Sequence, residues 1–173
     1  YMEEHGIVEI SGAVAAVVYQ NEDNGYTVLR LDTGASTVTV VGCLPMAAAG
    51  ERMTLSGSWV THPSHGDQFK AVAALRQMPT DPAGIFLYLA SGAVKGVGPA
   101  TAKLIVDRFG SQALEIMETA PEELAGLKGI SAKKALEISR ELRRQGSLRR
   151  LMEFLVARGF RSFVPLRLYQ LYG

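Results

Sequence analysis

The sequence has almost no cysteine and no long apolar run, and each scarcity excludes a class of protein. Cys43 is the only cysteine, so it can form no internal disulfide and cannot hold zinc alone, which indicates a reducing cytoplasm. No stretch approaches the roughly 18 uninterrupted apolar residues of a membrane span. Residues 1–5 have no basic region leading an apolar one, as an export signal would. We therefore expect a cytoplasmic protein that binds no membrane.

Motifs for catalysis and metal binding are also lacking. No segment matches G-x-x-x-x-G-K-[ST], the loop that holds ATP phosphates. His62, Ser64 and His65 have no carboxylate or third ligand at a suitable spacing, so a turn is favoured there over a metal site or a hydrolase centre. Gly96 and Gly98 follow no strand and precede no third glycine, which disfavours a dinucleotide site. We expect no catalytic residue, metal ligand or cofactor within this chain.

The net charge of +1 hides an asymmetry along the chain. Residues 1–80 carry four Lys/Arg against eight Asp/Glu, a net charge of −4, whereas residues 128–173 carry eleven against three, a net charge of +8. Such a concentration of positive charge is typical of proteins that bind polyanions. A solvated helical face gives the same count, so composition alone leaves both interpretations open.

The first half of the chain has the pattern of a small β-barrel. β-Branched residues recur in short runs, and Asn-Gly and Thr-Gly between them supply the positive φ angles that tight hairpins need. Five short strands within about 70 residues favour closure, because a closed barrel leaves no exposed edge. The expected strands are 8–19, 26–31, 37–43, 52–61 and 68–77.

The pattern changes at Pro79-Thr80-Asp81-Pro82, and short helices are expected from there on. Asp81 can cap a helix with Pro82 at its first position, and Pro99 can open the next. The sequence thus predicts an α+β chain with a barrel domain at 1–79 and a helical domain at 80–173. The first two expected helices run from 82 to 92 and from 99 to 110. Three more are expected to start at 111, at 121 and at 131 or 132. The last two run from 147 to 158 and from 162 to 172.

The helical half contains an internal repeat. Setting Gly96 over Gly129 aligns Val97 with Ile130, at an offset of 33 residues, and Gly159 begins a third and weaker copy. Each copy is expected to be a helix, a tight glycine turn and a second helix. The turns fall near 94–99 and 127–132 and, in degenerate form, near 157–162.

Such a turn can bind phosphate through its backbone. Two glycines let the chain approach a ligand closely, and the helix that follows adds unsatisfied amides and the positive end of its dipole. A plain connector between helices is the alternative; the repetition and the nearby lysines favour phosphate. The candidate contacts are Lys95, Gly96, Val97, Gly98, Ala100, Thr101, Lys103, Lys128, Gly129, Ile130, Ser131, Lys133 and Lys134. A third set, Arg158, Gly159 and Arg161, lacks the second glycine and is favoured more as part of the core.

These hairpins resemble helix-hairpin-helix DNA-binding motifs, most specifically over residues 89–102. They follow a barrel that contains NEDNGYTVL at 21–29, WVTHP at 59–63 and GDQF at 66–69. This order is similar to the N-terminal region of the long, stand-alone RecD-like helicases. The resemblance covers nearly the whole chain and implies an oligonucleotide-binding-like (OB-like) barrel followed by tandem helix-hairpin-helix motifs.

The resemblance also implies a function. Its members are ATP-dependent DNA helicases that move 5′ to 3′, which implies a bacterial, nucleoid-associated protein of DNA repair and recombination. Because the ATP-binding loop is missing, we expect a non-catalytic N-terminal fragment that grips single-stranded or junction DNA independently of sequence. ATP and Mg²⁺ would serve the motor domains elsewhere in the parent chain, and those domains are the other expected partner.

Two other functions remain open. A Holliday-junction-binding subunit of a branch-migration complex also has a barrel followed by two hairpins. Alternatively, the acidic barrel docks a protein partner and the hairpins are structural. Only Tyr19, Tyr26, Trp59 and Phe69 are candidates for stacking on bases, and we expect Trp59 and Phe69 to lie in the core instead.

Overall fold

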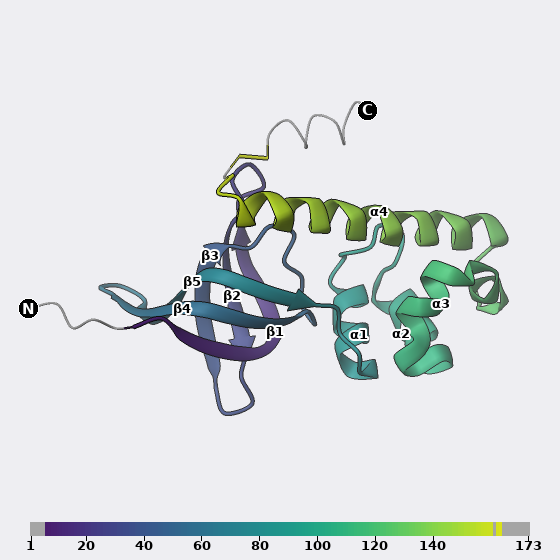
Figure 1. Cartoon of the computed structure of the whole chain (residues 1–173). Helices are drawn as coiled ribbons and strands as arrows, with labels where there is room; N and C mark the ends of the chain where they lie inside the picture. Colours follow the sequence, from purple (N-terminus) through teal and green to yellow (C-terminus); the bar gives the residue numbers. More distant parts are fainter. Residues whose placement is uncertain (1–5, 161, 164–173) are drawn as a thin grey trace, which may run out of the picture. The chain divides into compact units, whose positions relative to one another are not determined.

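The computed structural model describes residues 6–160, 162 and 163, which fold into strands followed by helices (Figure 1). The described residues form two compact units. One holds residues 6–47, 51–77 and the described residues from 151 to 163, and the other holds residues 48–50 and 78–150. We refer to them as the barrel unit and the helical unit.

The barrel unit is a closed five-stranded barrel with the strand order β1-β2-β3-β5-β4. All neighbours are antiparallel except β3 and β5, which pair in parallel through two residue pairs, Val40 with Phe69 and Val41 with Lys70. The expected fold class is confirmed, and the expected strands agree with the structure to within two residues. The strands are β1 (Val8–Gln20), β2 (Tyr26–Asp32), β3 (Thr37–Cys43), β4 (Arg52–His62) and β5 (Gly66–Gln77).

Alternating apolar residues fill the barrel, as the period-2 pattern of its strands requires. Leu29, Leu31, Leu55 and Phe69 are all fully buried there. The expectation that Trp59 also lies in the core is wrong, because its side chain is 41% exposed. Trp59 pairs with Phe69 near the turn of the β4–β5 hairpin, where β4 is exposed. The two rings pack edge to face, with their centroids 5.3 Å apart. Trp59 therefore covers Phe69 on one side and faces water on the other.

A buried ion pair ties three segments of the barrel unit together. Arg76 on β5 donates to both carboxylate oxygens of Glu51, at 2.5 and 3.1 Å, and to the carbonyl of Pro45 at 2.7 Å. Glu153 lies 3.3 Å from the same guanidinium. The side chains of Arg76 and Glu51 are 3% and 1% exposed, so the ion pair replaces nearly all of their contact with water.

The helical unit follows most of the expected helix starts. Asp81 caps the first helix by accepting from the Gly84 N–H at 3.1 Å, with Pro82 in the first position. The core of the helical unit consists of one apolar stripe from each helix together with Val94, Val97 and Ile130 of the connecting turns. The elements are α1 (Pro82–Ala90), α2 (Pro99–Phe109), η1 (Gly110–Gln112), α3 (Ala113–Thr119), η2 (Pro121–Gly126) and α4 (Ala132–Ala157).

Helix α4 is a single helix of 26 residues, where the sequence predicts two helices with a break before Ser147 (Figure 1). Gly146 is the residue just before that expected start. A glycine inside a helix costs only about 1 kcal/mol relative to alanine. The side chains of Leu142 and Met152, on either side of it, are both buried and offset that cost. Within the described part of the chain, no helix combines the length and the apolar character that a membrane crossing requires.

The third repeat has a different turn from the other two. The N–H of Phe160 donates to the carbonyl of Leu155 and that of Gly159 to Val156, both at 3.0 Å, which is the Schellman arrangement that ends a helix. The helix expected from Ser162 to Tyr172 falls almost wholly outside the described residues. Phe163 is described and is fully buried in the barrel unit, where its N–H donates to the Asp23 carbonyl at 2.6 Å.

Candidate nucleic-acid interface

The first two glycine turns have the same geometry. Gly96 and Gly129 have φ angles of +95° and +82°, a region that favours glycine. In each turn the N–H of the residue after the glycine donates to the carbonyl of the residue three positions earlier. Val97 donates to Val94 at 3.1 Å, and Ile130 donates to Leu127 at 3.2 Å. The repeat seen in the sequence is therefore a repeat of backbone structure.

The start of α2 presents uncapped amides. Gly98 is the N-cap residue and has no side chain, and among the described residues no side chain caps this helix. The helical ladder begins with the Ala102 N–H, which donates to the Gly98 carbonyl at 2.8 Å. The amides of Ala100 and Thr101 precede that bond, so they are donors without a partner inside the helix. A phosphate oxygen is a suitable acceptor for them.

The start of α4 differs in one respect. The Ser131 hydroxyl accepts from the Lys134 N–H at 3.1 Å, which satisfies one of the first amides of the helix. Ser131 is the residue that replaces the second glycine of the first hairpin. The second turn therefore offers fewer backbone donors than the first, and its lysines must contribute more of the attraction for an anion.

A groove of about 500 Å³ brings parts of the two hairpins together. Lys95 and Gly96 from the first hairpin line it with Ser131, Lys133 and Lys134 from the second. Ile138 of α4 is also part of the lining, and a Cβ on Gly96 would lie 3.7 Å from its Cγ1 atom. Three cationic side chains, Lys95 from the first hairpin and Lys133 and Lys134 from the second, thus border one groove.

Two carboxylates that were not predicted from the sequence share this groove. Glu137 and Glu141 lie on α4 and line the same space as the lysines. Glu141 accepts from the Arg144 guanidinium at 2.9 and 3.1 Å and from Gln145 at 2.9 Å. The hydrogen bonds from Arg144 lower the pKa of Glu141, and those from Gln145 and the charge of Lys95 act in the same direction. Lys133, Glu137 and Glu141 follow one another at intervals of four residues, which was the available signal.

The structure does not bring every candidate contact to the groove. Val97 and Ile130 are buried, and their N–H groups close the turns. Lys103 points along α2 and pairs with Asp107 at 3.0 Å. Lys128 and Gly129 are exposed but do not line the groove. Gly98, Ala100 and Thr101 at the start of α2 do not line it either.

The third candidate set lies in another environment. Arg158 and Gly159 belong to the barrel unit, where Gly159 ends α4. The Arg158 guanidinium lies 3.4 Å from the centre of the Phe154 ring, a cation–π contact. Arg161 lies outside the described residues. The described part of this set does not repeat the geometry of the first two turns.

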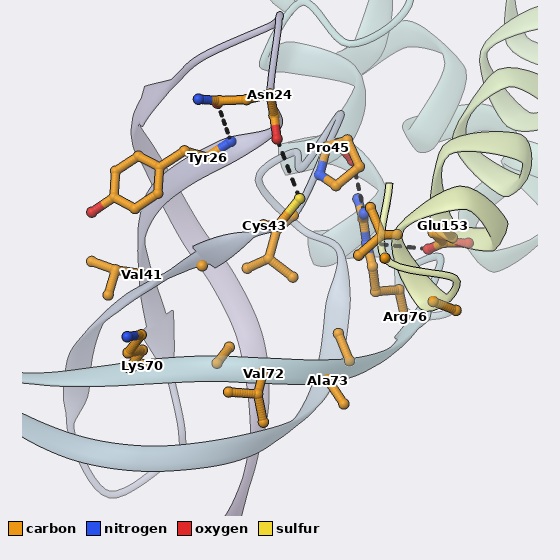
Figure 2. Close-up of a pocket in the computed structure, with 17 residues that line it drawn as sticks. Asn24, Tyr26, Val41, Cys43, Pro45, Lys70, Val72, Ala73, Arg76 and Glu153 are labelled. Carbon is orange, nitrogen blue, oxygen red and sulfur yellow. Dashed lines mark hydrogen bonds and ion pairs between the residues drawn. The ribbon is translucent and has the colours of Figure 1, made fainter. Parts of the chain in front are cut away.

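The barrel unit contains a larger cavity of about 790 Å³, bordered by β3, β5 and the end of α4 (Figure 2). Figure 2 shows Tyr26 and Lys70 on one side of it and Arg76 with Glu153 on the other. Tyr26 is 43% exposed, and its ring centre lies 6.4 Å from that of Tyr19, which is 51% exposed. This tyrosine pair is one exposed aromatic surface of the barrel, and Lys70 lines the same cavity as Tyr26.

The fold and the hairpins define a class of protein, a closed barrel followed by tandem glycine hairpins. Comparison with family models gives the particular families. Residues 8–79 match the OB-fold domain of the ATP-dependent DNA helicase YrrC, and residues 86–144 match the SAM-like helix-hairpin-helix tandem. The barrel is thus similar to the YrrC OB-fold domain and the helices to the helix-hairpin-helix tandem, which confirms the resemblance to a helicase N-terminal region. The two domain families together indicate nucleic-acid binding.

Proposed function

We propose that this chain is a non-catalytic DNA-binding module of a RecD-like ATP-dependent DNA helicase, and that it grips the DNA backbone independently of sequence. The observation that carries the proposal is the groove in the helical unit, where Lys95 and Gly96 of one hairpin meet Lys133 and Lys134 of the other. Backbone amides and lysines recognise phosphate, which every nucleotide carries.

The two hairpins contribute different groups in this proposal. The first supplies the amides of Ala100 and Thr101 together with the charge of Lys95. The second supplies Lys133 and Lys134, because Ser131 already occupies one of its amides. Phosphates at separated positions of one strand would bind at the two turns, which positions the DNA without reading its bases.

The barrel contributes a stacking surface in the same proposal. Tyr19 and Tyr26 expose their rings side by side, and base stacking on an aromatic ring contributes about 1–3 kcal/mol per base. The net charge of −4 over residues 1–80 favours the alternative, a protein-docking barrel. Replacing both tyrosines by alanine distinguishes the two, since only a barrel that stacks bases loses DNA affinity, and the double phenylalanine variant is the matched control.

The wider role belongs to the parent helicase. Its motor domains would use ATP and Mg²⁺ to move along the strand, and this module would hold the DNA for them. Single-stranded or junction DNA and the motor domains are then its partners. A symmetric tetramer in solution would favour the junction-binding alternative, whereas a monomer supports a module that works within one chain.

The deciding experiment measures DNA affinity by fluorescence anisotropy over a series of salt concentrations. Each phosphate contact contributes about 0.7–0.9 to the slope of log K against log salt. For Lys95→Ala/Lys133→Ala/Lys134→Ala we expect weaker binding and a slope shallower by about 2. The control is Lys103→Ala, because Lys103 pairs with Asp107 and does not line the groove. Unchanged affinity and slope in the triple variant would exclude these lysines as contacts.

A further inference from the structure

Helix α4 carries an exposed row of basic residues that the two hairpins do not explain. Lys133, Leu136, Arg140, Arg143, Ser147 and Arg150 are all exposed and follow one another at intervals of three or four residues. This spacing places them on one face of the helix. All of them belong to the helical unit. We call the four cations among them the α4 ridge: Lys133, Arg140, Arg143 and Arg150.

Within the part of the chain that the structure describes, the ridge arginines have no acidic partner, as is also true of other surface cations such as Arg52 and Arg108. Within the described residues, no carboxylate lies within ion-pair distance of Arg140, Arg143 or Arg150. By contrast, Lys103 pairs with Asp107, and Arg144, next in sequence to Arg143, pairs with Glu141. Two acidic side chains of α4 lie close to the ridge in the helical sequence: Glu137, one turn after Lys133, and Glu153, three residues after Arg150.

This arrangement has an energetic cost in the isolated protein. Arg140 and Arg143 are three residues apart, and like charges at that spacing destabilise a helix by a few tenths of a kcal/mol. A polyanion lying along the ridge would relieve the repulsion. The guanidinium group also matches phosphate, because it can donate two parallel hydrogen bonds to its oxygens.

The ridge is continuous with the groove. Lys133 belongs to both, since it lines the groove and begins the row along α4. The 17 residue steps from Lys133 to Arg150 cover about 26 Å of helix at 1.5 Å per step. That length corresponds to roughly seven base steps of B-form DNA at 3.4 Å each.

We infer that the α4 ridge is a second phosphate-binding surface, which binds the backbone of the same DNA that enters the groove. This inference rests on the proposed function and extends it to Arg140, Arg143 and Arg150. The groove fixes one or two phosphates, and the ridge binds those that follow. Nucleic acid is favoured over an acidic protein because the ridge shares Lys133 with the groove and repeats its charges along one line.

The test is a salt titration of DNA binding in the full chain. For Arg140→Ala/Arg143→Ala/Arg150→Ala we expect affinity about tenfold lower at low salt and a slope of log K against log salt shallower by about 2. The triple Arg→Lys variant keeps the charges and should keep the slope. Arg52→Ala/Arg108→Ala removes exposed charges elsewhere and should change the slope by less than the ridge variant.

The hairpin variant Lys95→Ala/Lys134→Ala, measured in parallel, separates the inference from the function on which it rests. If the hairpin variant weakens DNA binding and the ridge variant does not, the ridge is not a DNA contact and the proposed function stands. If neither variant weakens it, both are overturned. Unchanged DNA binding by the ridge variant, with loss of binding to polyglutamate, would assign the ridge to an acidic protein. Circular dichroism of each variant establishes that α4 is intact.

Discussion

The ring of Phe163 lies directly against Gly25, so that a Cβ added to Gly25 would be 2.8 Å from the Cε2 atom of the ring. Gly25 also has a φ of +75°, in the left-handed region. It ends the turn between β1 and β2, and Phe163 follows the end of α4. The contact joins two segments of the barrel unit that are 138 residues apart in the chain.

This contact predicts a large effect of Gly25→Ala. We expect a loss of about 2–4 kcal/mol in the free energy of unfolding, measured by urea denaturation, from backbone strain and displacement of the Phe163 ring. Gly34→Ala is the matched control, because Gly34 has a φ of +91° and no heavy atom within 4 Å of the added Cβ. Its cost should be only the strain, about 1–2 kcal/mol. Equal losses in the two variants would show that the Phe163 contact contributes nothing.

The buried pair of Glu51 and Arg76 predicts an asymmetric response to mutation. Glu51→Gln leaves the guanidinium buried without its full counter-charge, and we expect unfolding free energy to fall by about 3–5 kcal/mol. Replacing both residues, as Glu51→Leu/Arg76→Met, should cost less than the single change, because no fully buried charge is left unpaired: Glu153, the other partner of Arg76, is 32% exposed. Urea denaturation measures both. A double variant no more stable than the single one would contradict this account.

The Glu141 carboxylate predicts a pH dependence of stability. Hydrogen bonds from Arg144 lower its pKa in the folded protein below its ordinary value of 4.5. At pH values between the folded pKa and 4.5, the Glu141 carboxyl is protonated in the unfolded chain but ionised in the folded protein. The free energy of unfolding therefore rises with pH in this range, and it falls as the pH drops through the folded pKa. The stability that Glu141 contributes should therefore be fully present above about pH 5 and absent below the folded pKa.

Urea denaturation of the native protein and of Glu141→Gln from pH 7 to pH 3 measures this contribution as the difference between them. The difference should shrink as the solution becomes more acidic. Glu115→Gln, which removes an exposed carboxylate of α3, is the control. A difference for Glu141→Gln that stays constant across the whole range would contradict the assigned hydrogen bonds.

The acidic residues of the groove predict a variant with stronger DNA binding. Glu137 is exposed and lines the same groove as Lys133 and Lys134, so its charge repels a phosphate there. For Glu137→Gln we expect affinity about threefold higher at low salt, with the gain lost at high salt, as for an exposed charge pair. Glu122→Gln, on η2, should change affinity little. Weaker binding by Glu137→Gln would mean that Glu137 itself contacts the ligand.

The strands and most helix starts could be predicted because their signals are local. Asn24-Gly25 and Thr33-Gly34 fix two turns, and Asp81 and Pro99 mark helix starts, so neighbouring residues alone determine them. The separate helix expected from Ser147 was wrong for the opposite reason. Burial of Leu142 and Met152, which depends on the rest of the fold, outweighs the weak local preference of one glycine.

The groove could be predicted only in part. The repeat identified its two turns and its three lysines, but not that the turns border one space, which depends on how Gly96 packs against Ile138. The role of Ser131 as a cap and the presence of Glu137 and Glu141 also depend on side-chain direction. Trp59 was misplaced because alternation along β4 continues past the point where the barrel core ends.

The parallel pairing of β3 with β5 has a consequence for solubility. Only two residue pairs, Val40 with Phe69 and Val41 with Lys70, close the barrel there. If these pairs separate, both strands acquire an open edge whose N–H and C=O groups can pair with another molecule. The exposed Val72 and Leu75 on β5 would then lie beside that edge. Resistance to aggregation in this protein therefore depends on its shortest strand pairing.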